Sequence, residues 1–163
     1  MKTKAGLLIM LAGTMLFAAG CGIPFDIETP TETIELPNTM GAYFDTVVDI
    51  PEEARRDGVK FNTVSLIYTL RKANTFAAHI KLYASPDQAT HEERPANAVQ
   101  LLDENLTTLE TSKIGTAESQ TILDVLNAKQ ESFVIGAENL TSSPLSPIYI
   151  DISLRLQGTF GVF

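Results

Sequence analysis

The two histidines and the acidic residues near one of them have the clearest capacity for chemistry. Asp87, His91, Glu92 and Glu93 fall within one short polar stretch. An imidazole together with carboxylates can ligate Zn²⁺ or Ca²⁺. The stretch lacks the second histidine that an HExxH motif places on the same helix face. Because acidic residues in loops are usually solvated, we predict no metal site.

His79 is the other candidate, as a general base. It falls on the outward phase of the alternating stretch 76–82. A hydrolase would need His79 or His91 within hydrogen-bond reach of a nucleophile. The sequence contains no GxSxG elbow, no GxGxxG turn and no P-loop. We expect a protein that has no catalytic residues, is not an enzyme and needs no cofactor, and keep a hydrolase as a testable alternative.

The only cysteine, Cys21, ends a segment with the pattern of a leader peptide. Lys2 and Lys4 give a basic start, and residues 5–19 form an uncharged, mostly apolar run. This pattern is typical of a secretory signal. The run is short for a membrane-spanning helix, which needs roughly 20 apolar residues. A single thiol also cannot form an internal disulfide.

The residues Ala18-Ala19-Gly20-Cys21 resemble the lipobox of bacterial lipoproteins, in which small residues precede an obligatory cysteine. The resemblance covers residues 1–21 only. It implies that residues 1–20 are a signal peptide, cleaved between Gly20 and Cys21. It also implies a diacylglyceryl group on the Cys21 thiol and a fatty acid such as palmitate on the new amino terminus. Two or more acyl chains anchor a protein stably, whereas one chain binds only marginally.

The same resemblance implies a location in the cell envelope. Gly22 rather than Asp follows the cysteine, so lipoprotein sorting in a two-membrane bacterium would lead to the outer membrane. Loss of Lys2 and Lys4 with the leader changes the formal net charge from −8 to −10. An acidic surface favours neither anionic headgroups nor nucleic-acid phosphates. We therefore expect the acyl chains to supply the membrane attachment, and no nucleic-acid partner.

Length and composition indicate one globular domain after the leader. The chain has 163 residues, of which 44% are hydrophobic and 20% charged, which is ordinary for a folded protein. Residues 21–30 contain two prolines and no long Gly/Ser tract, and we interpret them as a short lipidated tether. Residues 31–163 are then the domain, held close to the bilayer.

Apolar residues in this domain mostly alternate with polar ones, which is typical of half-buried strands. The strongest example is 148–156, where the even-numbered residues are apolar and the outward positions include Asp151 and Arg155. Phe133 and Ile135 indicate another strand. Further strands are predicted over 31–36 and 44–50, the latter with Phe44 on its buried face.

Two alternating stretches, 64–70 and 76–82, predict a hairpin around a turn at Ala73-Asn74. The phase of Phe61 is opposite to that of Val64, which indicates a bulge near Asn62-Thr63. Residues 97–115 are ambiguous. The apolar residues expected to contribute strands there are Val99, Leu101, Leu106 and Leu109.

One helix is predicted, where Ser119 can cap a turn whose apolar residues have helical spacing, among them Ile122 and Leu126. The polar stretches Pro86–Pro95 and Asn139–Pro147 are predicted loops. The pattern favours an all-β fold: an antiparallel β-sandwich of immunoglobulin-like architecture with one short helix. The tryptophan and cysteine pair of true immunoglobulin domains are absent from the sequence.

These observations favour a membrane-anchored envelope lipoprotein that acts as a non-enzymatic structural or interaction module. Its partner would be an envelope protein or a polymer, bound through loops or an edge strand. The alternative is a carrier that holds a lipid or another apolar ligand between its sheets. A carrier would need an apolar cavity of roughly 300 Å³ or more.

Overall fold

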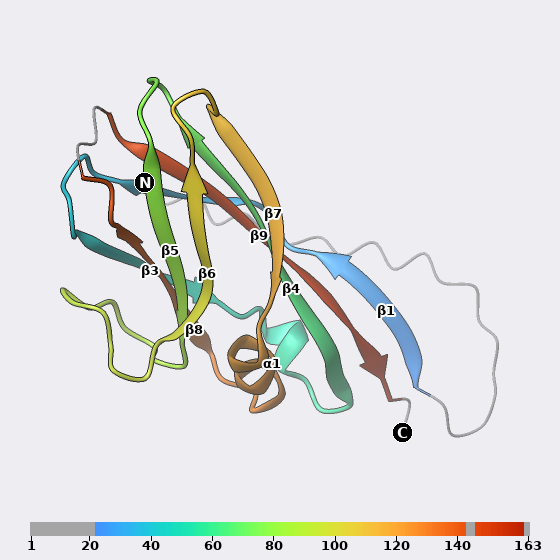
Figure 1. Cartoon of the computed structure of the whole chain (residues 1–163). Coiled ribbons are helices and arrows are strands. Elements are labelled where there is room, and N and C mark those ends of the chain that lie inside the picture. The colour runs from blue at the N-terminus through green and yellow to red at the C-terminus, as the bar shows by residue number, and fades with distance from the viewer. Residues whose placement is uncertain (1–21, 143–145, 162–163) are drawn as a thin grey trace, which may run out of the picture.

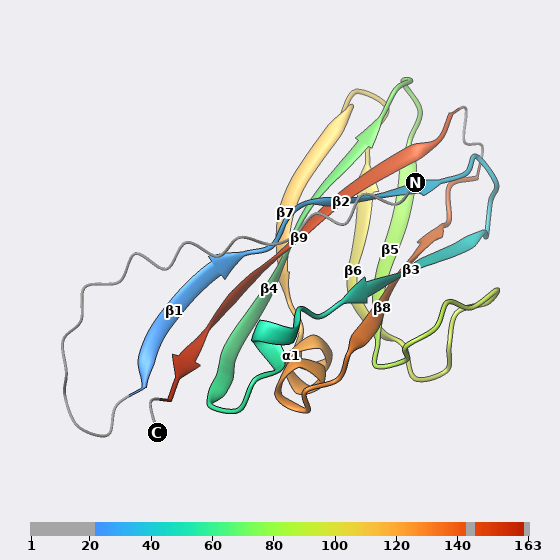
Figure 2. The same ribbon diagram turned by 180° about the vertical axis from the view of Figure 1, so that it is seen from behind.

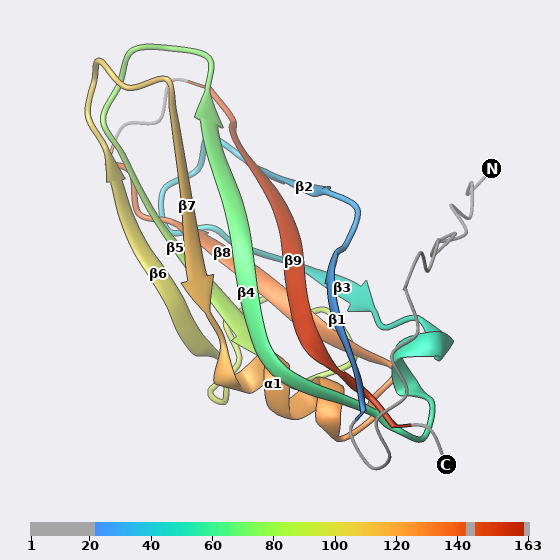
Figure 3. The same cartoon turned by 90° about the vertical axis from the view of Figure 1, so that its right-hand side faces the viewer.

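Two antiparallel sheets stack face to face in the computed structural model, which describes residues 22–142 and 146–161 (Figure 1). Sheet A contains β1 (Ile23–Glu28), β2 (Glu32–Leu36), β4 (Val59–Lys72), β7 (Ser112–Glu118) and β9 (Ile148–Phe160). Sheet B contains β3 (Tyr43–Asp49), β5 (Ala78–Ser85), β6 (Val99–Leu106) and β8 (Ser132–Asn139). Figure 3 shows sheet A in front of sheet B, with β4 and β9 at its centre.

The strand pairs are nested along the chain. β5 pairs with β6, β4 with β7, β3 with β8, and both β1 and β2 with β9. Two more pairs, β4 with β9 and β5 with β8, join these ribbons into the two sheets. The chain is thus one long hairpin, with its tip between β5 and β6, rolled into a sandwich. This is the connectivity of a jelly roll.

The predicted antiparallel β-sandwich with one short helix is confirmed. It has the two-sheet architecture of an immunoglobulin-like sandwich, but the order β3-β8-β5-β6 in sheet B belongs to the jelly-roll connection pattern. Strand alternation reports which face of a strand is buried and not which strand lies beside it. For that reason the sequence predicted the architecture and not the connections.

The core fills the space between the sheets. Inward positions of β4 and β9, such as Leu66, Leu70 and Ile150, are fully buried against Leu82 and Ile135 of sheet B. Burial of such apolar surface stabilises a fold by about 25 cal/mol per Å². The even-numbered residues of β9 point inward, as the sequence predicts, and the predicted bulge lies between Phe61 and Thr63.

The helix α1 (Gln120–Asn127) closes one end of the sandwich, between β7 and β8 (Figure 3). The Ser119 hydroxyl accepts a hydrogen bond from the backbone N–H of Ile122, at 3.2 Å, and so caps the helix as predicted. Ile122, Val125 and Leu126 are buried. A short 3-10 helix, η1 (Glu52–Arg55), lies between β3 and β4.

The predicted hairpin between 64–70 and 76–82 is wrong. Both stretches are strands, but β4 lies in sheet A and β5 in sheet B. The two edges of β4 are occupied by β7 and β9, so β5 has no edge to pair with. Instead the two strands pack their apolar faces against each other across the core.

The prediction that residues 21–30 form a tether outside the domain is also wrong. Residues 23–28 form β1, which pairs with β9 along its whole length. Phe25 and Ile27 pack against the core, and Pro24 is tolerated because β1 is an edge strand. The sandwich therefore begins at Ile23 rather than at residue 31.

Two single residues also depart from prediction. Phe44 is half exposed, since β3 is an edge strand and has a neighbour on one side only. Leu109 is 88% exposed because it lies in the turn between β6 and β7 rather than in a strand. Val99, Leu101 and Leu106 do lie in β6, as expected.

Candidate functional site

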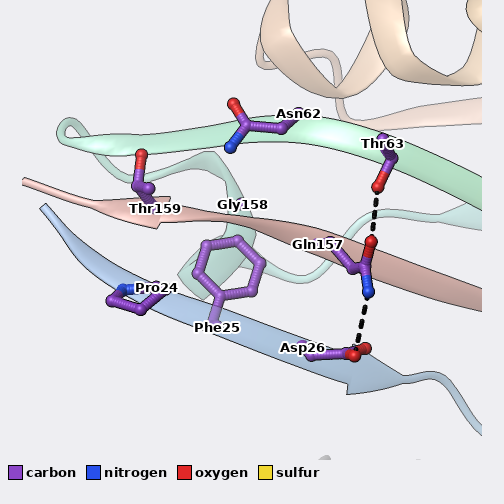
Figure 4. Close-up of a pocket in the computed structure, with 8 residues that line it drawn as sticks. All are labelled: Pro24, Phe25, Asp26, Asn62, Thr63, Gln157, Gly158 and Thr159. Atoms are coloured by element: carbon purple, nitrogen blue, oxygen red, sulfur yellow. Dashed lines mark hydrogen bonds between the residues drawn. The ribbon is translucent and has the colours of Figure 1, made fainter.

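A shallow hollow of about 460 Å³ opens on the outer face of sheet A, where β1, β9 and β4 run side by side (Figure 4). Gln157 bridges two of the residues that line it. The Gln157 Oε1 accepts from the Thr63 hydroxyl at 2.8 Å, and the Gln157 Nε2 donates to the Asp26 Oδ2 at 2.9 Å. The residues that line it are Pro24, Phe25, Asp26, Asn62, Thr63, Gln157, Gly158 and Thr159.

Asp26 connects this hollow to a fork of hydrogen bonds from Arg155. The Arg155 Nε and Nη2 donate to the two Asp26 oxygens at 2.9 and 2.6 Å. The hydrogen bonds from Arg155 and then Gln157 lower the pKa of Asp26 to about 2. These side chains tie β1 to β9 from the solvent side, in addition to the strand hydrogen bonds.

The floor of the hollow requires glycine at position 158. A Cβ there would lie 2.2 Å from the backbone oxygen of Lys60 and 2.6 Å from the Phe25 ring. The Phe25 ring is thus free to sit over Gly158, where it meets Phe61 edge-on at 5.6 Å. A polar rim therefore surrounds an apolar base.

Similar ordered contacts continue along the same face toward its far end. The Arg71 Nε and Nη2 donate to Asp151 at 2.7 and 2.8 Å, and the Arg71 guanidinium lies 5.8 Å from the centre of the Tyr149 ring. The Thr33 hydroxyl donates to Asp151 at 2.7 Å, and the Arg71 and Thr33 hydrogen bonds lower the pKa of Asp151. We call this surface the sheet A platform: Asp26, Thr33, Thr63, Arg71, Tyr149, Asp151, Arg155 and Gln157.

The platform offers hydrogen-bond donors and acceptors in fixed positions, one aromatic ring, and an open surface. Sequence patterning identified Asp151 and Arg155 as outward-facing but not as members of a site. Their partners Arg71 and Asp26 come from other strands, and only the folded sheet brings them together. Such a surface can bind a polar partner.

His79 lies on the outer face of sheet B, as its phase predicts. Its Nε2 lies 2.6 Å from Asp103 Oδ1, and Lys81 contacts the same carboxylate at 3.3 Å. In the described part of the chain, no hydroxyl or thiol side chain bonds to the His79 ring. A second hollow of about 400 Å³ lies beside it at the end of sheet B, with Ser142 in its lining.

His91 contacts two carboxylates, of which the sequence pattern identified only that of Asp87. Its Nδ1 lies 3.1 Å from Asp45 Oδ2, and its Nε2 lies 3.2 Å from Asp87 Oδ2. Asp45 is 46 residues away in the sequence, on β3, which is why the pattern missed it. Glu92 and Glu93 are exposed and stay apart from this cluster. Within residues 22–142 and 146–161, no three His, Cys, Asp or Glu side chains converge as metal ligands.

The His91 contacts fasten the loop 86–98 onto the outer face of sheet B. The Arg94 Nη1 donates to the Tyr83 hydroxyl at 2.8 Å, and its guanidinium stacks 4.7 Å from the centre of that ring. The Tyr83 hydroxyl donates in turn to Glu138 at 2.8 Å. Burial is the main reason that the pKa of Tyr83 is raised. The predicted loop Pro86–Pro95 is confirmed as a loop, and it covers its own sheet.

The interior leaves little room for the carrier hypothesis. The inward side chains of both sheets form one continuous core, and the two hollows described above are both open to solvent. The lipidation and cleavage residues, Cys21 and Gly20, lie outside the described residues, as does part of the predicted loop Asn139–Pro147. Neither α1 nor η1, the helices of the described chain, has the length and apolarity for a membrane crossing.

No known protein family and no curated protein matches the chain. Solved structures with a similar fold include a protein of the native virion of Kashmir bee virus at acidic pH. It is 13% identical, with a TM-score of 0.43, over 99% of this chain and 84% of that one. A Triatoma virus empty capsid protein is 12% identical, with a TM-score of 0.39, over 85% and 92%. A family 35 carbohydrate binding module from Clostridium thermocellum is 12% identical, with a TM-score of 0.35, over 80% and 96%.

Proposed function

We propose that the protein is a lipoprotein of the cell envelope, anchored by acyl chains on Cys21, with a non-enzymatic sandwich that serves as an interaction module. One observation carries the anchoring part. The first strand begins at Ile23 and pairs with β9 from that residue onward. Cleavage between Gly20 and Cys21 would therefore remove the leader without removing any part of the sandwich.

Expression in a two-membrane bacterium with labelled palmitate tests the anchor. We expect the label to enter the parent protein and the precursor to be shortened. Cys21→Ser removes the thiol that would be acylated, so this variant should stay unlabelled and uncleaved. Label or cleavage retained by Cys21→Ser contradicts the proposal. Ser142→Ala, far from the leader in sequence, serves as a control that should behave as the parent.

The sheet A platform is the surface we propose for the partner, an envelope protein or a polymer. Its side chains are ordered by one another and free of a covering loop, and all are exposed except Tyr149 and Asp151, which are half-buried. The corresponding face of sheet B is occupied by the loop 86–98. The continuous apolar core supports an interaction module over a carrier, since the inward side chains of both sheets pack into one cluster.

A photocrosslinking amino acid at Thr69, on the platform side of β4, tests this surface in intact cells. The control position is Lys81 on the outer face of sheet B. We expect a discrete crosslinked product from Thr69 that is absent from Lys81. Products of equal yield from both positions, or from Lys81 alone, contradict the assignment of the binding surface.

A further inference from the structure

Three apolar residues form a row across the end of sheet A at which the first strand, β1, begins. Ile23 on β1 and Val59 on β4 are both paired with Phe160 on β9. Ile23 is 47% exposed and Phe160 is 42% exposed. In Figures 1 and 2 the start of β1, the end of β9 and the start of β4 lie together at one end of the molecule. We call Ile23, Val59 and Phe160 the terminal row.

The chain is already fixed to this end one residue after the cysteine. A Cβ on Gly22 would lie 3.0 Å from the Thr159 Cβ and 3.1 Å from the Phe160 backbone oxygen. Gly22 is therefore in contact with β9. In the anchor proposed above, the lipidated residue is the one bonded to Gly22, and consecutive Cα atoms are about 3.8 Å apart. The anchor would therefore be attached beside the terminal row.

The charges next to the terminal row suit a headgroup layer. Arg56 and Lys60 are exposed, and neither takes part in an ion pair with a described residue. Asp57 lies between them in the sequence, so residues 56–60 have a formal charge of +1, and residues 51–60, with Glu52, Glu53 and Arg55 added, are neutral in a chain that is strongly acidic overall. A lysine can reach phosphates while its carbon chain stays on apolar surface.

We propose that the terminal row rests in the headgroup region of the bilayer and holds the sandwich in one orientation, with its far end pointing away. The proposal rests on the lipid anchor proposed above and adds the lipid surface as a second, non-covalent partner. β4 has 14 residues, so the turn between β6 and β7, beside its other end, lies roughly 40 Å away at about 3.3 Å per residue. In this orientation the sheet A platform extends away from the membrane, and its hollow lies close to the membrane.

The test uses the full acylated protein in phosphatidylcholine vesicles that contain a headgroup-level nitroxide lipid. The single native cysteine would carry the acyl group, so an introduced cysteine is the only free thiol for a fluorophore. One label replaces Asp57, near the terminal row, and another replaces Glu110, in the turn between β6 and β7. We expect the nitroxide to quench the label at position 57 at least two-fold more than the label at position 110.

Side-chain insertion is separated from simple proximity by two variants with the label at position 57. Ile23→Ser with Phe160→Ser should lower the quenching at least two-fold, and Ile23→Ser alone should lower it less. Leu109→Ser, which removes an even more exposed apolar side chain at the far end, should leave the quenching unchanged. Equal quenching at 57 and 110, or no loss in the double variant, overturns the orientation.

The intact mass of each sample keeps the two proposals apart. An acylated protein with equal quenching at both positions overturns the orientation and leaves the anchor standing. A protein whose mass shows no acyl group overturns the anchor, and the orientation with it.

Discussion

The outer faces of the two sheets differ in how much of each face a loop covers. On sheet B the loop 86–98 lies across the strands, and Tyr83 and Val134 are 2% and 0% exposed although both point outward. On sheet A no loop of the described chain covers the centre of the face, and Arg155 and Gln157 are exposed. The covered face therefore contributes to stability, while the open face is available to a partner.

The two faces also differ in how their charges are held. The Asp45 carboxylate is 2% exposed and lies under His91. The carboxylates of sheet A remain in contact with water and are held by arginine forks. Buried polar groups are costly to leave unpaired, whereas exposed ion pairs contribute little. Substitutions on sheet B should therefore cost more stability than similar substitutions on sheet A.

The largest difference is expected between two tyrosines. Tyr83→Ala removes a buried ring and should lower the free energy of unfolding by about 3–4 kcal/mol, as for other buried aromatics. Tyr149→Ala on the open face should lower it by less than about 1 kcal/mol. Urea unfolding of both variants measures the difference, and equal losses contradict the contrast.

Asp45→Ala should have the next largest effect. Loss of a buried acceptor for His91 should lower the free energy of unfolding by about 2 kcal/mol and loosen the loop 86–98. A protease that cuts after glutamate should then cleave at Glu92 or Glu93 faster than in the parent. Asp103→Ala, which removes the more exposed carboxylate beside His79, is the matched control and should leave the cleavage rate unchanged.

A much weaker effect is expected for Arg71 and Asp151 on the open face. A double-mutant cycle with Arg71→Ala and Asp151→Ala should show coupling far below the loss seen for Tyr83→Ala, because solvent screens the pair. The same cycle should reduce crosslinking from Thr69 if this pair orders the platform for its partner. A coupling as large as the Tyr83 effect would mean that the open face is needed for folding.

The smallest effect is a pH dependence at β1. The pKa of Asp26 is about 2, below its ordinary value of 3.8. A carboxyl with a depressed pKa stabilises the fold above its unfolded pKa and loses that contribution as the pH falls toward the folded value. Hydrogen exchange of β1 amides should therefore speed up, relative to β4, between about pH 4 and pH 2. Asp26→Asn should remove this extra change, and its persistence in the variant would point to another group.

The sequence correctly predicted features that depend on residues close together in one strand or helix. The alternation over 148–156 identified the buried face of β9, and Ser119 identified the start of α1, because both signals lie within a few residues. Sequence patterns failed to predict which strands pair, because the partner strand lies far along the chain. The strands β4 and β5 follow each other in the chain but lie in different sheets, and the nested pairing that separates them has no local signature.

In the candidate sites, too, local features were predicted and distant partners were missed. The phase of His79 was predicted, but Asp45 beside His91 and Asp26 beside Arg155 come from far along the sequence. Residues 21–30 were interpreted as a tether because two prolines interrupt them, and only pairing with β9 reveals β1. The platform and the terminal row depend on this strand.

The mass of the mature protein, purified from the membranes of a bacterial host, tests the central claim most directly. We expect a chain that begins at Cys21 and carries the added mass of its acyl groups. A chain that begins at another residue, or one that begins at Cys21 with an unmodified thiol, would contradict the lipid anchor.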